Sequence, residues 1–297
     1  MVPVPYHMGL SRLQIARKDI VRFFDDRGPR VYSHKEVADI FSGQRFHWHL
    51  PLNLTTRAFF EFLKDKTPFV EKKLASESYD SLVRYAWRDV SPYQIALSMR
   101  AGSYLSHGTA VFLHGLTDQS PKTIYVNREQ SPKPKPTSMT QEGIKRAFSG
   151  RQRKSNYVFL SDGWRFVLIS GKNTENLGVE KIKDPTDAPV EVTSIERTLI
   201  DITVRPEYAG GVYQVLAAYE AAKEKVSVTD VMKILKKLDY AYPYHQAIGC
   251  YMQKAAYKES EYSKFAKLGF HYDFYLANGM SNPQLNQDWR LYCPQGF

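Results

Sequence analysis

The order of helix and strand patterns in the N-terminal third of the chain restricts its fold most strongly. Apolar residues recur at helical spacing over residues 13–24, and two further helices are predicted at 33–41 and 55–64. Two strand-like runs, 69–74 and 82–87, follow and are separated by a polar loop, which indicates a β-hairpin. Three helices followed by a hairpin are the order of a winged helix-turn-helix.

A winged helix binds DNA through its third helix, which enters the major groove, and through its hairpin, which touches the backbone. DNA contacts are therefore predicted among the polar and basic side chains of these two elements: Thr55, Thr56, Arg57, Lys64, Lys72, Lys73 and Arg84. The link over residues 42–53 is long for this motif, in which a turn of ~3–4 residues is usual. The competing interpretation is a small α+β subdomain with solvated charges.

The net charge of +10 is concentrated in two parts of the sequence. Residues 1–88 carry a net charge of +5 and residues 121–160 carry +7, whereas the rest of the chain carries −2. This partition favours a polyanionic partner, and nucleic acid is the first candidate. The central stretch predicts a second basic surface formed by Lys133, Lys135, Lys145, Arg146, Arg151, Arg153 and Lys154.

The fold class predicted for the whole chain is α+β, with a winged-helix domain over residues 1–88 and a second domain over 89–297. The second domain is expected to mix sheet and helices to about residue 205 and to be mainly helical after it. Short strand patterns and local helix-start signals support this division. Ser33 with Glu36, and Thr193-Ser-Ile-Glu196, both have the spacing of a capping box, and Ser106 is expected to cap a further helix. Arg197 and Asp201 are four residues apart on one predicted helix and can form an ion pair.

No residue pattern in the chain has the spacing of an enzyme's catalytic set or of a nucleotide-binding loop. We therefore predict no enzyme activity, no catalytic residues, no cofactor and no metal. His47 and His49 lack further ligands that would complete a zinc tetrahedron. A hydrolytic site of His107, His114 and Asp201 is conceivable, but a hydrogen-bonded core role for the histidines is favoured.

The sequence also predicts a cytoplasmic protein without a membrane span. Cys250 and Cys293 are too few for a disulfide framework. The N-terminus has no basic segment followed by an apolar one, as a secretory signal requires. The longest uncharged stretch, residues 101–117, is interrupted by Gly, Ser and two His and is too polar to cross a bilayer.

Two segments, taken together and in this order, closely resemble the AbiEi family. Residues 100–116 contain S-H-G-T-A and H-G-L, and residues 192–201 contain E-R-T-L-I-D. The tail over residues 272–292 is also similar to longer members. The motif residues are Ser106, His107, His114, Glu196, Arg197 and Asp201.

AbiEi proteins are the antitoxins and transcriptional regulators of bacterial AbiE (type IV) toxin–antitoxin systems, which act in phage defence by abortive infection. The resemblance implies a winged helix that binds inverted repeats in its own promoter. It also implies a second domain that neutralises a nucleotidyltransferase toxin, AbiEii, without requiring a stable complex. Two alternatives stay open: a winged-helix protein with a nuclease or effector-binding second domain, and an RNA- or toxin-binding interaction protein.

Overall fold

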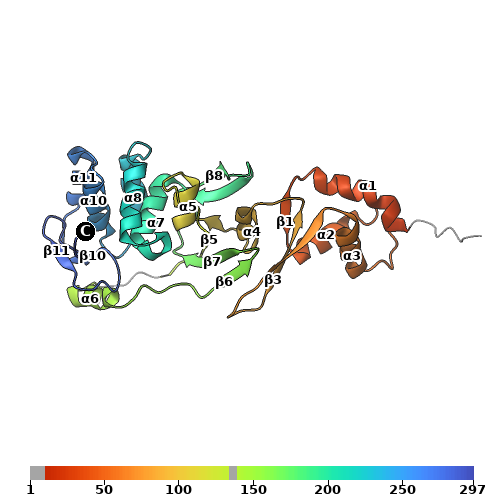
Figure 1. Ribbon diagram of the computed structural model, residues 1–297, viewed down its shortest axis with the longest axis horizontal. Helices are drawn as coiled ribbons and strands as arrows, with labels where there is room; N and C mark the ends of the chain where they lie inside the picture. The colour runs from red at the N-terminus through yellow and green to blue at the C-terminus, as the bar shows by residue number, and fades with distance from the viewer. Residues whose placement is uncertain (1–10, 134–138) are drawn as a thin grey trace, which may run out of the picture. The chain divides into compact units, whose positions relative to one another are not determined.

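A computed structural model describes residues 11–133 and 139–297 (Figure 1). The chain forms two compact units that divide between Met99 and Arg100. Both units combine helices with sheets, so the predicted α+β class is confirmed. No helix in the described part of the chain is both long enough and apolar enough to cross a bilayer.

The first unit begins with helices and ends with a hairpin and one further helix. Its elements are α1 (Arg12–Asp25), β1 (Arg30–Tyr32), α2 (His34–Gln44), α3 (Thr56–Lys66), β2 (Phe69–Leu74), β3 (Leu82–Trp87) and α4 (Pro92–Ser98). The strands form an antiparallel sheet in the order β1-β3-β2. The three predicted helices and the hairpin are confirmed, whereas the short strand β1 was not predicted.

Aromatic side chains hold this unit together. The ring of Phe24 stacks on Trp87 at 4.7 Å between centroids, and Phe41 stacks on Phe59 at 4.6 Å. All four side chains are fully buried, so each removes a large apolar surface from water. Contacts of this kind join the helices to the sheet, which explains why the helical spacing of apolar residues predicted the elements correctly.

Helix α4 belongs to the first unit, although a boundary was expected at residues 88–89. The Arg84 guanidinium on β3 donates hydrogen bonds to the carbonyl oxygens of Ser98 (2.9 Å) and Met99 (3.0 Å). Gln94 on α4 donates to the carbonyl of Pro29, next to β1. These bonds tie both ends of α4 to the sheet, and the chain divides only after this helix.

The second unit contains a mixed six-stranded sheet in the order β6-β7-β5-β4-β9-β8. Strand β7 is parallel to β5, and β4 is parallel to β9, while the other neighbours are antiparallel. The strands are β4 (Tyr104–Leu105), β5 (Thr123–Glu129), β6 (Val158–Ser161), β7 (Trp164–Gly171), β8 (Val179–Lys183) and β9 (Pro189–Thr193).

Helices of the second unit enclose one large apolar core. They are α5 (His107–Leu113), α6 (Gln141–Ser149), α7 (Ile195–Val204), the 3-10 turn η1 (Pro206–Ala209), α8 (Val212–Ala222), α9 (Val228–Leu238), α10 (Tyr244–Lys254) and α11 (Glu259–Ala266). Figure 1 shows α7, α8 and α10 in cyan to blue. The aromatic tail, in the part of the chain expected to be mainly helical, folds into a small sheet in the order β10-β12-β11. Its strands are β10 (Phe274–Tyr275), β11 (Gln284–Asn286) and β12 (Leu291–Cys293).

One glycine before β8 allows α7 to approach the sheet. Gly178 has a φ of +71°, and a Cβ added to it would lie 2.9 Å from Cβ of Arg197. Gly163, in the turn between β6 and β7, has a similar φ of +76° but nothing within 4 Å. The two positions therefore share the left-handed conformation that favours glycine, and only Gly178 combines it with close packing.

We expect Gly178→Ala to destabilise the protein by about 1–3 kcal/mol more than Gly163→Ala, because only the first alanine also forces packed atoms apart. Urea denaturation of the two variants measures the difference. Equal losses of unfolding free energy would show that the close approach of α7 contributes nothing.

Candidate functional site

The start of α3 presents part of the predicted DNA-binding set. Arg57 is exposed and Thr56 is half-buried. Thr55 has a different role, because its Oγ1 accepts a hydrogen bond from the amide of Ala58 and caps the helix. Of the three residues predicted to contact DNA at this end of α3, Thr55 therefore has a structural role as the helix cap.

Lys64 is held by carboxylates of its own unit. Its Nζ lies 3.2 Å from Oε1 of Glu61 on the same helix and 3.5 Å from Oε2 of Glu71 on β2. These pairs neutralise the lysine and join α3 to the hairpin. The expected contact of Lys64 with DNA would have to displace both.

In the hairpin, Lys73 is exposed to solvent, whereas Arg84 is hydrogen-bonded within the unit. Lys73 is exposed and Lys72 is half-buried on β2. Arg84 is half-buried, and its guanidinium is bonded to the carbonyls at the end of α4 described above. These bonds give Arg84 a structural role, and the expected contact with the phosphate backbone would have to displace them.

In the second unit, the two motif histidines make different contacts. His107 opens α5 with a φ of +51°, and its Nδ1 lies 2.8 Å from Oγ of Ser106. Ser106 occupies the N-cap position but makes no capping bond, contrary to expectation. Nε2 of His114 lies 2.7 Å from the carbonyl oxygen of Thr193.

The second motif builds the start of α7. Nε of Arg197 lies 2.8 Å from Oδ1 of Asp201, and the side chains are only 3% and 6% exposed, so the predicted pair is confirmed as a buried one. The predicted capping box is wrong by one residue. Ser194 is the N-cap, and Glu196 instead accepts a hydrogen bond from the amide of Ser227.

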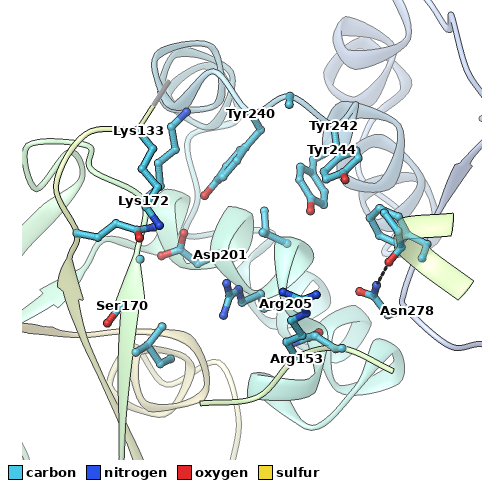
Figure 2. A pocket seen from close by; sticks show the side chains of 18 of the residues that line it. Lys133, Arg153, Ser170, Lys172, Asp201, Arg205, Tyr240, Tyr242, Tyr244 and Asn278 are labelled. Carbon is cyan, nitrogen blue, oxygen red and sulfur yellow. Dashed lines mark hydrogen bonds between the residues drawn. The ribbon is translucent and has the colours of Figure 1, made fainter. Parts of the chain in front are cut away.

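An open cleft of about 1170 Å³ lies within the second unit. Lys172, Asp201, Arg205 and Tyr240 are among its lining residues, and Figure 2 shows them with Arg153 around the opening. The described lining contains seven Lys and Arg side chains against two Asp. The basic members are Lys133, Arg146, Arg151, Arg153, Lys172, Arg197 and Arg205.

The cleft gathers more than half of the predicted second basic surface. Lys133, Arg146, Arg151 and Arg153 line it. Lys145 is exposed on α6 and is not part of the lining, and Nζ of Lys154 pairs with Glu207 at 2.9 Å. Lys135 lies outside the described residues.

Several lining residues belong to none of the predicted sites. Lys172 follows β7 and Arg205 follows α7, and both lie in a part of the sequence that is nearly neutral. Tyr240 and Tyr242 come from the segment between α9 and α10. The close spacing of tyrosines at 240, 242 and 244 is the local signal that could have pointed to them.

His107 forms a neutral part of the cleft. Burial, together with the charges of Arg205 and Arg197, lowers the pKa of His107 from 6.5 to about 3. Burial raises the pKa of Asp201, and the adjacent Arg197 opposes that rise. The cleft therefore combines a strongly cationic lining with a histidine that stays uncharged at neutral pH.

The hydrolytic site considered for His107, His114 and Asp201 is not assembled. His107 and Asp201 line the cleft, but His114 does not. Among residues 11–133 and 139–297, no three His, Cys, Asp or Glu side chains are grouped to hold a metal ion. The arrangement is suited to holding an anion by electrostatic attraction and hydrogen bonds.

No family model matches the sequence, and no curated protein matches it. Among solved structures, the chain is similar to the crystal structure of the RV2827C protein from Mycobacterium tuberculosis. The two are 11% identical, with a TM-score of 0.56, over 94% of this chain and 91% of that chain. At this identity the likeness concerns the fold.

The low pKa of His107 predicts a specific pH dependence of stability. In the unfolded chain, the imidazole of His107 takes up a proton near pH 6.5. In the folded protein it is protonated only near pH 3. Stability present above pH 6.5 is therefore lost as the pH falls, by up to ~1.4 kcal/mol per pH unit.

We expect His107→Asn, which tolerates the positive φ, to remove this component. Urea denaturation between pH 4 and 7 should show the unfolding free energy of the wild type falling more steeply than that of the variant. Parallel curves would contradict the assignment of a neutral, buried His107.

Proposed function

We propose that this protein is a DNA-binding transcriptional autorepressor and antitoxin of a type IV toxin–antitoxin system. Its first unit binds inverted repeats in its own promoter as a winged helix-turn-helix. Its second unit counteracts a nucleotidyltransferase toxin of the AbiEii kind, and the protein itself catalyses no reaction.

The observation that carries the DNA-binding part is the arrangement of the first unit. The order α1-β1-α2-α3-β2-β3, with the antiparallel sheet β1-β3-β2, is the one expected for a winged helix. Its third helix carries the exposed Arg57, and its hairpin carries the exposed Lys73. In the proposed complex Arg57 reads bases in the major groove and Lys73 lies at a phosphate.

The long link between α2 and α3 is compatible with this proposal because it is itself folded. The guanidinium of Arg45 donates hydrogen bonds to the carbonyls of Leu52 (2.9 Å) and Leu54 (2.7 Å). Trp48 and Leu50 of the link are buried in the core of the unit. A braced link of this kind holds the start of α3 in place as a short turn does in other members of the motif.

The antitoxin part of the proposal rests on the sequence resemblance to AbiEi proteins. Its motif residues Arg197 and Asp201 form the buried ion pair of α7. The cationic cleft favours one of the alternatives as a second candidate, in which the second unit also binds an effector. The nuclease alternative receives no support, because His114 lies outside the cleft.

For DNA binding, we expect Arg57→Ala to weaken retention of a promoter duplex by about 10-fold or more in a mobility-shift assay, because a base contact in the major groove contributes ~1–3 kcal/mol. Lys73→Ala should weaken binding to any duplex. It should also reduce the slope of log K against log salt concentration by about one, because one phosphate contact is lost. Lys18→Ala, which removes an exposed charge from α1, is the matched control. Unchanged retention by the Arg57 variant would reject α3 as the recognition helix.

For the antitoxin activity, we expect the neighbouring gene to encode a nucleotidyltransferase of the AbiEii kind. Co-expression of the full chain should then restore growth of cells that express this enzyme. The Arg57→Ala variant should rescue growth equally well, because the proposal assigns neutralisation to the second unit. Failure of the wild type to rescue would reject the antitoxin part, and failure of the variant alone would show that rescue depends on DNA binding.

A further inference from the structure

Five of the cations that line the cleft form no salt bridge with any residue that the structure describes. Within the described residues, the side chains of Lys133, Arg146, Arg151, Arg153 and Arg205 make no ion pair and no hydrogen bond. Some exposed cations elsewhere in this unit are paired, as Lys154 is with Glu207, but the cleft gathers its unpaired cations around one concavity. Keeping several unneutralised charges around one concavity costs stability through mutual repulsion, and an anionic ligand removes that cost.

These cations converge from separate elements. Lys133 follows β5, Arg146 lies on α6, Arg151 and Arg153 follow that helix, and Arg205 ends α7. In Figure 2, Arg153 and Arg205 point into the opening from one side, and Tyr240 and Tyr242 lie on the other. Convergence on one cavity suits a compact ligand with several adjacent negative charges, whereas a long polynucleotide favours a groove that follows its backbone.

The lining also contains buried polar atoms that require a partner. Oδ1 of Asn127, and both Oε1 and Nε2 of Gln152, are buried without a hydrogen bond. A buried group of this kind costs about 1–3 kcal/mol while it is unsatisfied. The two oxygens need a donor, which a phosphate lacks and a ribose hydroxyl or a base amino group supplies.

Aromatic side chains complete the requirements for a nucleoside. Tyr240 and Tyr242 are half-buried in the lining, and Nζ of Lys172 lies 5.4 Å from the centroid of the Tyr240 ring. Stacking of bases on aromatic rings is a general mode of nucleotide recognition. The cleft, at about 1170 Å³, is large enough for a ligand with a base, a sugar and a phosphate chain.

We propose that the cleft of the second unit binds a nucleoside polyphosphate. The phosphates lie at Arg146, Arg151, Arg153 and Arg205, and the base and sugar lie toward Tyr240. This site is independent of the DNA-binding surface of the first unit. If the cleft binds no nucleotide, the proposal that the first unit is a repressor is therefore unaffected.

Titration calorimetry with the full chain tests the proposal. The probes are ATP, GTP, AMP, inorganic triphosphate, adenosine and a single-stranded oligoribonucleotide of ~8 residues. We expect the nucleoside triphosphates to bind at least about 10-fold more tightly than AMP, inorganic triphosphate or adenosine, with an affinity that falls as salt rises. Binding of the oligoribonucleotide alone, or of no nucleotide at millimolar concentration, would overturn the proposal.

A matched pair of variants locates the site. Arg153→Gln with Arg205→Gln removes two charges from the cleft, and Lys145→Gln with Lys154→Gln removes two from the same basic region outside it. The first pair should weaken ATP binding by about 10-fold or more, and the control pair by less than about threefold. Equal effects would reject the cleft as the site.

Two further comparisons keep the test decisive. Thermal unfolding establishes that each variant is folded, and Arg151→Gln with Arg153→Gln, both exposed, replaces the first pair if Arg205→Gln unfolds the unit. Equal affinities for ATP and inorganic triphosphate would overturn the nucleoside part, because only ATP offers donors to Asn127 and Gln152.

Discussion

A buried network of polar side chains is the constraint on which the second unit depends. Arg197 on α7 pairs with Asp201 and donates hydrogen bonds to the carbonyl of Leu177 and to Oγ1 of Thr174. Thr174 in turn donates to the carboxylate of Glu129 at the end of β5. Since an unpaired charge in such a place is strongly destabilising, all members must be in position together, and helix and sheet are thereby fixed to each other.

This network also explains the character of the cleft beside it. Arg197 is neutralised by its partner and serves the structure, whereas Arg205, one turn beyond Asp201, has no carboxylate of its own. The rigid contact between α7 and the sheet therefore holds an unpaired guanidinium at the lining. A cleft supported in this way is largely formed before any ligand arrives, which limits the entropy that binding must offset.

Much of the fold was predictable because its signals are local. The capping box of Ser33 and Glu36 is formed as predicted, and the hairpin strands begin and end where the alternation indicated. The pairing of Arg197 with Asp201 followed from their spacing on one helix. The capping box predicted at the start of α7 failed because a distant segment competed for the same group: Glu196 accepts a hydrogen bond from the amide of Ser227. The bonds of Arg84 to the end of α4 also depend on a segment that its own neighbours in the sequence do not reveal.

The candidate sites, like the fold, combine features that local sequence determines with features that depend on distant segments. The sequence by itself determined the elements of the first unit and the existence of a basic excess around residues 121–160, because both depend on composition and on contacts between near neighbours. Only the tertiary structure decided which of those cations meet in a cleft and which are neutralised. It also brought in Arg205 and Tyr240 from a part of the sequence that is nearly neutral, since convergence in space depends on how distant elements pack and leaves no periodic trace along the chain.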